Sequence, residues 1–218
     1  MTSDLQKLGG IAALIEAALY VTGFGLFLTV LDSSGHEGHV QQIAFVAANQ
    51  VASYIAYLLI YVVFGVVLVV LALALHARLK NRSPAIMQTA TAFGLIWAGL
   101  VIASGMIANI GNSAVIGLFS ENQDQAVSLW LAIITIQEAL GGGNEIVGGL
   151  WVLLLSWAAL RGGSLPKALN YLGVLVGLAG ILTVVPAFEL LMDVFGLGQI
   201  VWFAWLGIVM LRETPSAT

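Results

Sequence analysis

Several residue types are scarce or missing in this chain of 218 residues. It has no cysteine, which excludes disulfide bonds, thiolate metal sites and a cysteine nucleophile. Charged residues make up only 8% of the chain, and lysine and arginine together number seven. Seven basic residues cannot form the phosphate-neutralising surface that nucleic-acid binding requires, so we expect no nucleic-acid partner.

Hydrophobic residues, by contrast, make up 60% of the chain, and the mean hydropathy is +1.02. Soluble domains are about 45–50% apolar and about 25% charged. The composition therefore predicts a multi-pass integral membrane protein whose main partner is the lipid bilayer.

Stretches almost free of charge indicate one all-α transmembrane domain, residues 1–218, with six spans. Lipid requires backbone groups to be satisfied within a helix or a closed barrel, and these runs are too long and too uniformly apolar for barrel strands. The predicted spans are 8–31, 51–75, 84–110, 143–160, 166–188 and 199–211.

Lysine and arginine give the orientation. With six spans, all seven basic residues fall on one side of the membrane, together with both ends of the chain. The positive-inside rule makes that side cytoplasmic, so both termini are predicted to be cytoplasmic. Most acidic residues fall on the opposite side, where they give the outer face a negative potential that attracts cations.

Residues 124–161 are too long for one span, because a single helix of that length extends about 55 Å. Gly141, Gly142 and Gly143 offer a natural break. We therefore expect an outer interfacial helix over 125–140, followed by the span 143–160. One long tilted helix with an outer overhang is the alternative.

The last third of the chain carries packing and turn motifs. They are a Gly-Leu-Trp span at 147–154, a Leu-Pro turn at 161–167, a glycine-rich span at 173–180 and a closing Trp-Leu segment at 202–207. With these motifs, residues 145–213 resemble the DUF4386 family, bacterial six-span proteins of unknown function, whereas the first half matches in hydropathy alone. The resemblance implies a multi-pass protein of the bacterial cytoplasmic membrane and no established activity or cofactor.

Two glutamates interrupt apolar spans and are candidate proton- or cation-binding groups. A charge at the bilayer centre costs about 2.5–3.5 kcal/mol, so Glu16 and Glu145 are expected to face protein or water. Asn109 and Asn144 are predicted to accompany Glu145 in an outward-facing polar vestibule, with Asn112, Glu189 and Gln199 nearby. The alternative is that both glutamates are neutral or hydrogen-bonded and only hold helices together.

The first outer loop contains His36, Glu37 and His39, which form a candidate zinc or copper site. Their spacing is not the helical His-Glu-x-x-His pattern of metalloproteases. An exposed polar loop without metal is the alternative.

Gly173, Gly177 and Gly180 share one side of the fifth predicted span. Small residues at this spacing are typical of close helix–helix packing. The contact is either within the chain or between copies in a homo-oligomer.

Three functional hypotheses follow. The first is a non-catalytic membrane protein, either an accessory subunit of a larger membrane complex or a small-molecule binder. The second is a small proton- or cation-coupled transporter or channel that uses the intramembrane glutamates. The third is a membrane-embedded enzyme with a metal in the outer loop, and it ranks last because no nucleophile–base pair is evident.

Overall fold

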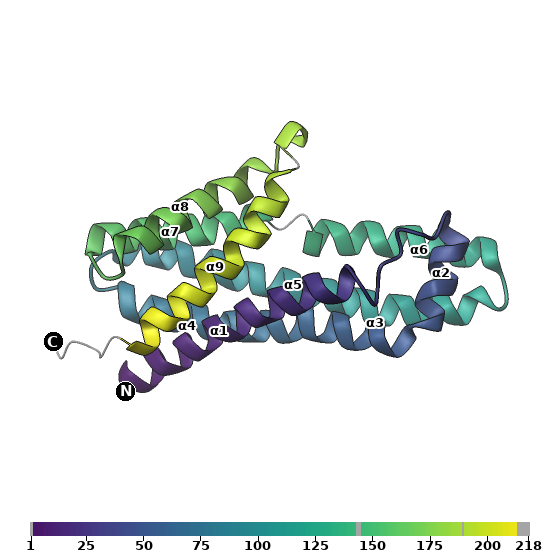
Figure 1. Ribbon diagram of the computed structural model, residues 1–218, viewed down its shortest axis with the longest axis horizontal. Helices are drawn as coiled ribbons and strands as arrows, with labels where there is room; N and C mark the ends of the chain where they lie inside the picture. The colour runs from purple at the N-terminus through teal and green to yellow at the C-terminus, as the bar shows by residue number, and fades with distance from the viewer. Residues whose placement is uncertain (1, 143–144, 189, 213–218) are drawn as a thin grey trace.

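The computed structural model describes residues 2–142, 145–188 and 190–212, and every regular element within these ranges is helical (Figure 1). This confirms the predicted all-α class. The elements are α1 (Thr2–Phe27), α2 (His39–Ala48), α3 (Gln50–Tyr57), η1 (Leu58–Val63), α4 (Phe64–Leu79), α5 (Pro84–Phe119), α6 (Gln123–Gln137), η2 (Glu138–Gly142), α7 (Glu145–Gly162), α8 (Lys167–Leu182), η3 (Pro186–Phe188) and α9 (Leu191–Arg212).

Five helical stretches within the described residues are long and apolar enough to cross a membrane: Asp4–Phe27, Gln50–Leu79, Pro84–Phe119, Gln123–Gly162 and Leu191–Arg212. The fourth runs across residues 143–144, which lie outside the described residues. Helix α8 is also apolar but has only 16 residues. These helices fit a multi-pass membrane protein, while the count of six spans and the orientation stay predictions.

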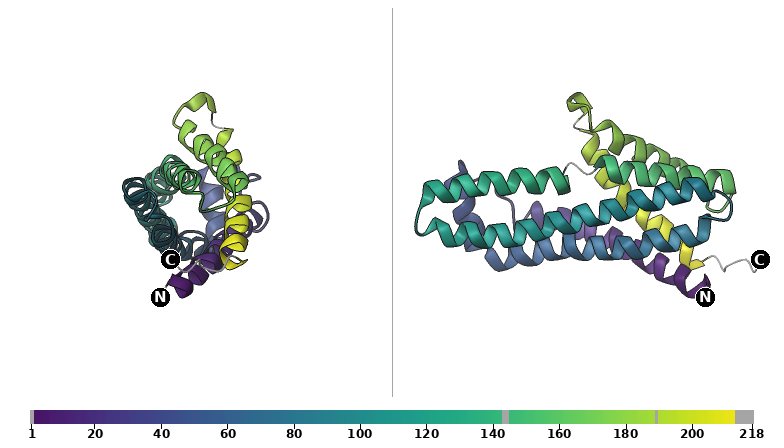
Figure 2. Two further views of the ribbon diagram at one scale, coloured as in Figure 1. Left: turned by 90° about the vertical axis from the view of Figure 1, so that its left-hand side faces the viewer. Right: turned by 180° about the vertical axis from the view of Figure 1, so that it is seen from behind.

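The six helices α1, α4, α5, α7, α8 and α9 form what we call the main bundle, to which α5 contributes its first half (Figures 1 and 2). Glycine allows the closest contacts in it. A Cβ atom on Gly149 would lie 2.6 Å from the carbonyl oxygen of Gly177, and one on Gly177 would lie 2.8 Å from the carbonyl oxygen of Gly149. Helices α7 and α8 therefore pack backbone against backbone, which only a residue without a side chain permits.

The other two glycines of the α8 stripe also face inward. A Cβ atom on Gly173 would meet Ser156 Oγ of α7, and one on Gly180 would lie 2.6 Å from the Glu145 carbonyl oxygen. The stripe is thus buried within the chain, as the intrachain alternative expects.

One end of the main bundle carries all the lysines and arginines; we call it the basic end. Arg78 donates to the carbonyl of Ser164 at 3.1 Å, and Arg82 donates to that of Gly162 at 2.6 Å. These bonds tie the α4–α5 turn to the α7–α8 turn, and α1 begins and α9 ends at the same end of the main bundle (Figure 1). The basic residues are Lys7, Arg78, Lys80, Arg82, Arg161, Lys167 and Arg212.

The interior of the main bundle is aromatic. Trp97, Trp151, Trp202 and Phe203 are at most 1% exposed. They join Tyr20, Phe64 and Phe195 in a continuous cluster, in which neighbouring ring centroids lie between 5.3 and 6.5 Å apart. We call these seven rings the aromatic cluster; edge-to-face and tilted pairs of this kind add to the stabilisation by buried area.

Beyond the main bundle, α2, α3, α6 and the second half of α5 form a second, smaller unit that we call the extension (Figure 1). Its separate core contains Ile43, Val115, Ala126, Trp130 and Ile133. Helix α6 begins at an Asn122 cap, whose side chain accepts a hydrogen bond from the Gln125 backbone at 3.1 Å. A helix before the glycines was predicted; α6 lies alongside α5, where a Cβ on Gly111 would be 2.7 Å from Ile133.

Several predicted span boundaries differ from the observed helix ends. Helix α5 continues to Phe119 instead of ending at 110, because Asn112 and Val115 are buried against the extension. Helix α9 begins at Leu191 rather than at 199. Helix α8 ends at Leu182 rather than at 188, and Pro186 opens a separate 3₁₀ turn, because proline has no backbone N–H to donate to a helical hydrogen bond.

Candidate functional site

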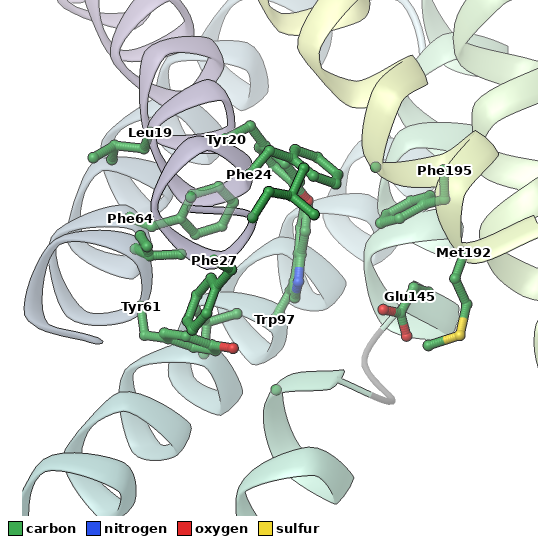
Figure 3. A pocket seen from close by; sticks show the side chains of 16 residues that line it. Leu19, Tyr20, Phe24, Phe27, Tyr61, Phe64, Trp97, Glu145, Met192 and Phe195 are labelled. Atoms are coloured by element: carbon green, nitrogen blue, oxygen red, sulfur yellow. The ribbon is translucent and has the colours of Figure 1, made fainter. Parts of the chain in front are cut away.

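A cavity of about 430 Å³ lies where the main bundle meets the extension (Figure 3). Its walls come from α1, η1, α4, α5, η2, α7 and α9. Seven of its 16 lining residues are aromatic: Tyr20, Phe24, Phe27, Tyr61, Phe64, Trp97 and Phe195. Two lining residues, Leu28 at the end of α1 and Met192 at the start of α9, are exposed, so the cavity opens between these two helices.

Glu145 is the one charged residue among the described residues that line this pocket. It is half-buried and occupies the first position of α7, and Figure 3 shows its carboxyl group beside Met192 and Phe195, across the pocket from the Tyr61 ring. The start of a helix stabilises negative charge. The protein thus places one carboxylate in an aromatic cavity.

Two tyrosines supply further polar groups. Tyr61 belongs to the π-helical turn η1, and its hydroxyl oxygen accepts a hydrogen bond from Gln137 Nε2 at 3.3 Å. Tyr20 lines the same pocket as Tyr61 and Glu145, and it follows Glu16 by one helical turn of α1. The pocket thus lies one helical turn from the buried Glu16.

The two π-helical turns, η1 and η2, are closely packed against each other and against α5. Ser104 of α5 donates to the Gln137 carbonyl at 3.0 Å. A Cβ atom on Gly141 of η2 would meet Ser104 Oγ and lie 2.9 Å from Tyr61 Cε1. Single-turn π-helices in an otherwise α-helical chain are frequent at functional sites, and here two of them flank one pocket.

Glu16 lies deeper in the main bundle. Its side chain is 0% exposed, and neither carboxyl oxygen has a hydrogen-bond partner within the described residues. Gln199 of α9 is also 0% exposed with both amide atoms unpartnered, although the sequence placed it in an outer vestibule. Burying a polar group without a partner costs about 2–7 kcal/mol, so Glu16 and Gln199 are expected to lower the stability of the folded protein.

Asn109 does not join Glu145. It lines a second cavity of about 320 Å³ between α3 and α5, together with Asn112, and its Nδ2 donates to the Tyr54 carbonyl at 3.3 Å. Asn144 and Glu189, the other predicted companions of Glu145, lie outside the described residues. Asn109 and Glu145 thus line different cavities, and the wider vestibule stays a prediction.

The candidate metal ligands of the first loop are not placed together in the structure. The His36 ring packs on Phe45 with centroids 4.5 Å apart, and His39 Nδ1 lies 3.4 Å from Gln42 Oε1. In the described part of the chain, no group of three or more His, Asp or Glu side chains is placed to hold a metal ion, so a metal on His36, Glu37 and His39 stays a prediction.

The aromatic lining is what sequence reasoning missed. Tyr20, Phe24 and Phe27 recur at helical spacing along α1 and face the cavity together. That stripe was a visible signal, but in an apolar span an aromatic stripe predicts lipid contact as readily as a pocket.

Comparison with known proteins shows to which family the chain belongs. Searches of curated proteins and of solved structures found no match. The family model described as "Domain of unknown function (DUF4386)" matches residues 8–209, which is most of the chain. The protein therefore belongs to the DUF4386 family.

Proposed function

We propose that this protein is a non-catalytic, small-molecule-binding membrane protein, and that its ligand occupies the pocket holding Glu145. The observation that carries the proposal is the cavity of about 430 Å³, with its largely aromatic lining and single carboxylate. Ligand sites are usually cavities of about 300–1,000 Å³ with apolar walls and a few polar groups that fix orientation. The pocket fits that description in size and in composition.

The position of the pocket supports the same role. Its walls come from seven elements spread along the chain from α1 to α9, so a bound molecule would join helices of the main bundle to the π-helical turns η1 and η2. Such a protein acts alone or as the ligand-sensing subunit of a larger complex.

A filled pocket tests the proposal. Gly23 lines the cavity on α1, and a Cβ there would lie 3.3 Å from Ile60 Cγ2, so the larger side chain of Gly23→Leu would enter the cavity. Gly25 on the same helix is exposed with no atom within 4 Å of a built Cβ, which makes Gly25→Leu the matched control.

Binding is measured by saturation-transfer NMR with a panel of small aromatic amides and amines, using the full chain in lipid nanodiscs. We expect members of the panel to bind the native protein and Gly25→Leu equally, and to lose binding in Gly23→Leu. Absence of binding to the native protein, or equal binding to Gly23→Leu, would contradict the proposal.

A second candidate function is proton- or cation-coupled transport. Glu16 favours it, because a fully buried carboxyl group with no partner, one helical turn from pocket-lining Tyr20, is the kind of group that carries protons through membrane proteins. Proteoliposomes containing a pH-sensitive dye test it. Proton flux that Glu16→Gln abolishes and Glu138→Gln leaves intact would support it, whereas native proteoliposomes no leakier than empty liposomes would exclude an uncoupled proton path through Glu16.

A further inference from the structure

We infer that the ligand of the Glu145 pocket is an organic cation: an amine or quaternary ammonium group attached to an apolar or aromatic body. This inference rests on the proposed function, because it names the chemical class of molecule that the same pocket takes. It draws on the charge of the lining, the type of aromatic surface and the placement of charge over the whole chain.

Charge is the first argument. Glu145 brings one carboxyl group into a cavity whose other described lining residues are uncharged. A positive charge next to a carboxyl group favours its ionised form. An anionic ligand would place a second negative charge beside it, and a neutral one would leave the carboxylate partly desolvated without a counter-charge. A ligand with one positive charge compensates both costs, because attraction between opposite charges strengthens as water is excluded.

The aromatic lining is the second argument. Tyr20, Trp97, Phe195 and four other aromatic side chains surround the space that Glu145 faces (Figure 3). Aromatic faces attract ammonium groups, and tryptophan attracts them most strongly. A carboxylate and aromatic faces around one cavity are complementary to a cation with an apolar body.

Access is the third argument. All lysines and arginines lie at the basic end, whereas the pocket opens between the end of α1 and the start of α9. Asp193 directly follows Met192 at this opening and is exposed. Asp193 thus adds a negative charge at the entrance, away from the basic end, and this arrangement favours the approach of cations over anions.

A matched pair of probes tests the inference. Benzyltrimethylammonium and N-benzylacetamide are similar in size and both contain a benzyl group, but only the first is charged. Each is titrated by calorimetry into the full chain in zwitterionic lipid nanodiscs, with empty nanodiscs as the blank. We expect the native protein to bind the cation at least about tenfold more tightly than the amide, as expected for a partly desolvated ion pair.

Two substitutions assign that preference to one carboxylate. Glu145→Gln should reduce the cation preference to within about threefold, while Glu138→Gln, an equal charge change at an exposed position in η2, should leave it unchanged. Equal binding of both probes by the native protein overturns the inference, and so does an unchanged preference in Glu145→Gln.

The outcomes also distinguish failure of the cation inference from failure of the proposed function. Binding of the amide alone, or equal binding of both probes, contradicts the inference that the ligand is a cation but is consistent with a small-molecule pocket. If neither probe binds the native protein, the result contradicts both the cation inference and the proposed function. Because the ratio between the probes is measured within the native protein, the result stands even where a variant fails to fold, which size-exclusion elution and helical circular dichroism reveal.

Discussion

The main bundle and the extension differ in how they are held together. The main bundle has a large interior centred on the aromatic cluster, with glycine contacts that bring α7 and α8 backbone to backbone. The extension is closed by five buried residues, of which Trp130 is the one aromatic. The pocket lies where the two meet, which places the ligand site at a junction between a strongly packed unit and a weakly packed one.

The largest expected difference concerns tryptophan. Trp202→Ala in the main bundle should lower the free energy of unfolding by about 3–5 kcal/mol, because it removes a ring that is 1% exposed and contacts Trp151 and Phe203. Trp130→Ala in the extension should cost about half as much, since that ring packs in a small core. Unfolding in mixed micelles, followed by circular dichroism, measures both.

Trp157, which is 50% exposed, supplies the control, and Trp157→Ala should change the stability little. Equal losses for Trp202→Ala and Trp130→Ala would show that the two units are equally cohesive.

The next effect concerns the buried carboxyl group. Glu16→Leu should raise the free energy of unfolding by about 1–3 kcal/mol, because a leucine fills similar space and leaves no unpartnered oxygen. Glu138→Leu, at an exposed position, should stay within about 0.5 kcal/mol of the native value. A destabilised Glu16→Leu would show that the carboxyl group has partners and a structural role.

A smaller effect is expected at the junction. Tyr61→Phe removes the hydroxyl that accepts from Gln137, and it should cost about 0.5–1.5 kcal/mol by loosening η1 from α6. Tyr171, which is 62% exposed on α8, provides the matched Tyr171→Phe control, expected to be neutral. Equal stabilities of the two variants would mean that this hydrogen bond does not hold the junction.

The smallest effect lies in the loop after α1. Hydrogen bonds from the Ser34 side chain and backbone lower the pKa of exposed Asp32. Because the folded-state pKa is the lower one, the small stabilisation is present above the pKa of the unfolded chain and is lost as the pH falls through the folded value. Carboxyl NMR should show Asp32 titrating at lower pH in the native protein than in Ser34→Ala; identical midpoints would argue against the bond.

The sequence predicted the fold class well, because hydropathy alone requires helices in lipid. It also predicted a helix before Gly141 and close packing by the α8 glycines, since glycine spacing is a local signal. The long α5 was missed because Asn109 and Asn112 resemble a helix end, and only contact with the extension explains why the helix continues.

The site was predicted in part. Glu145 stands out in the sequence as a charge among apolar residues, and the structure places it in a pocket. Its companions could not be predicted, because depth along a helix axis does not say which face a residue occupies. Tyr20 and Phe195 are brought to Glu145 by the packing of α1 and α9 around the main bundle, whereas Asn109 faces α3 instead.

Photolabelling tests the central claim, a ligand pocket at Glu145, most directly. A benzylamine carrying a ring-attached diazirine is irradiated with the protein in nanodiscs, with and without excess benzyltrimethylammonium, and labelled peptides are identified by mass spectrometry. We expect labels at Glu145 and on residues 19–28 that the competitor suppresses. Labels confined to exposed helix faces or to the extension, unaffected by the competitor, would contradict it.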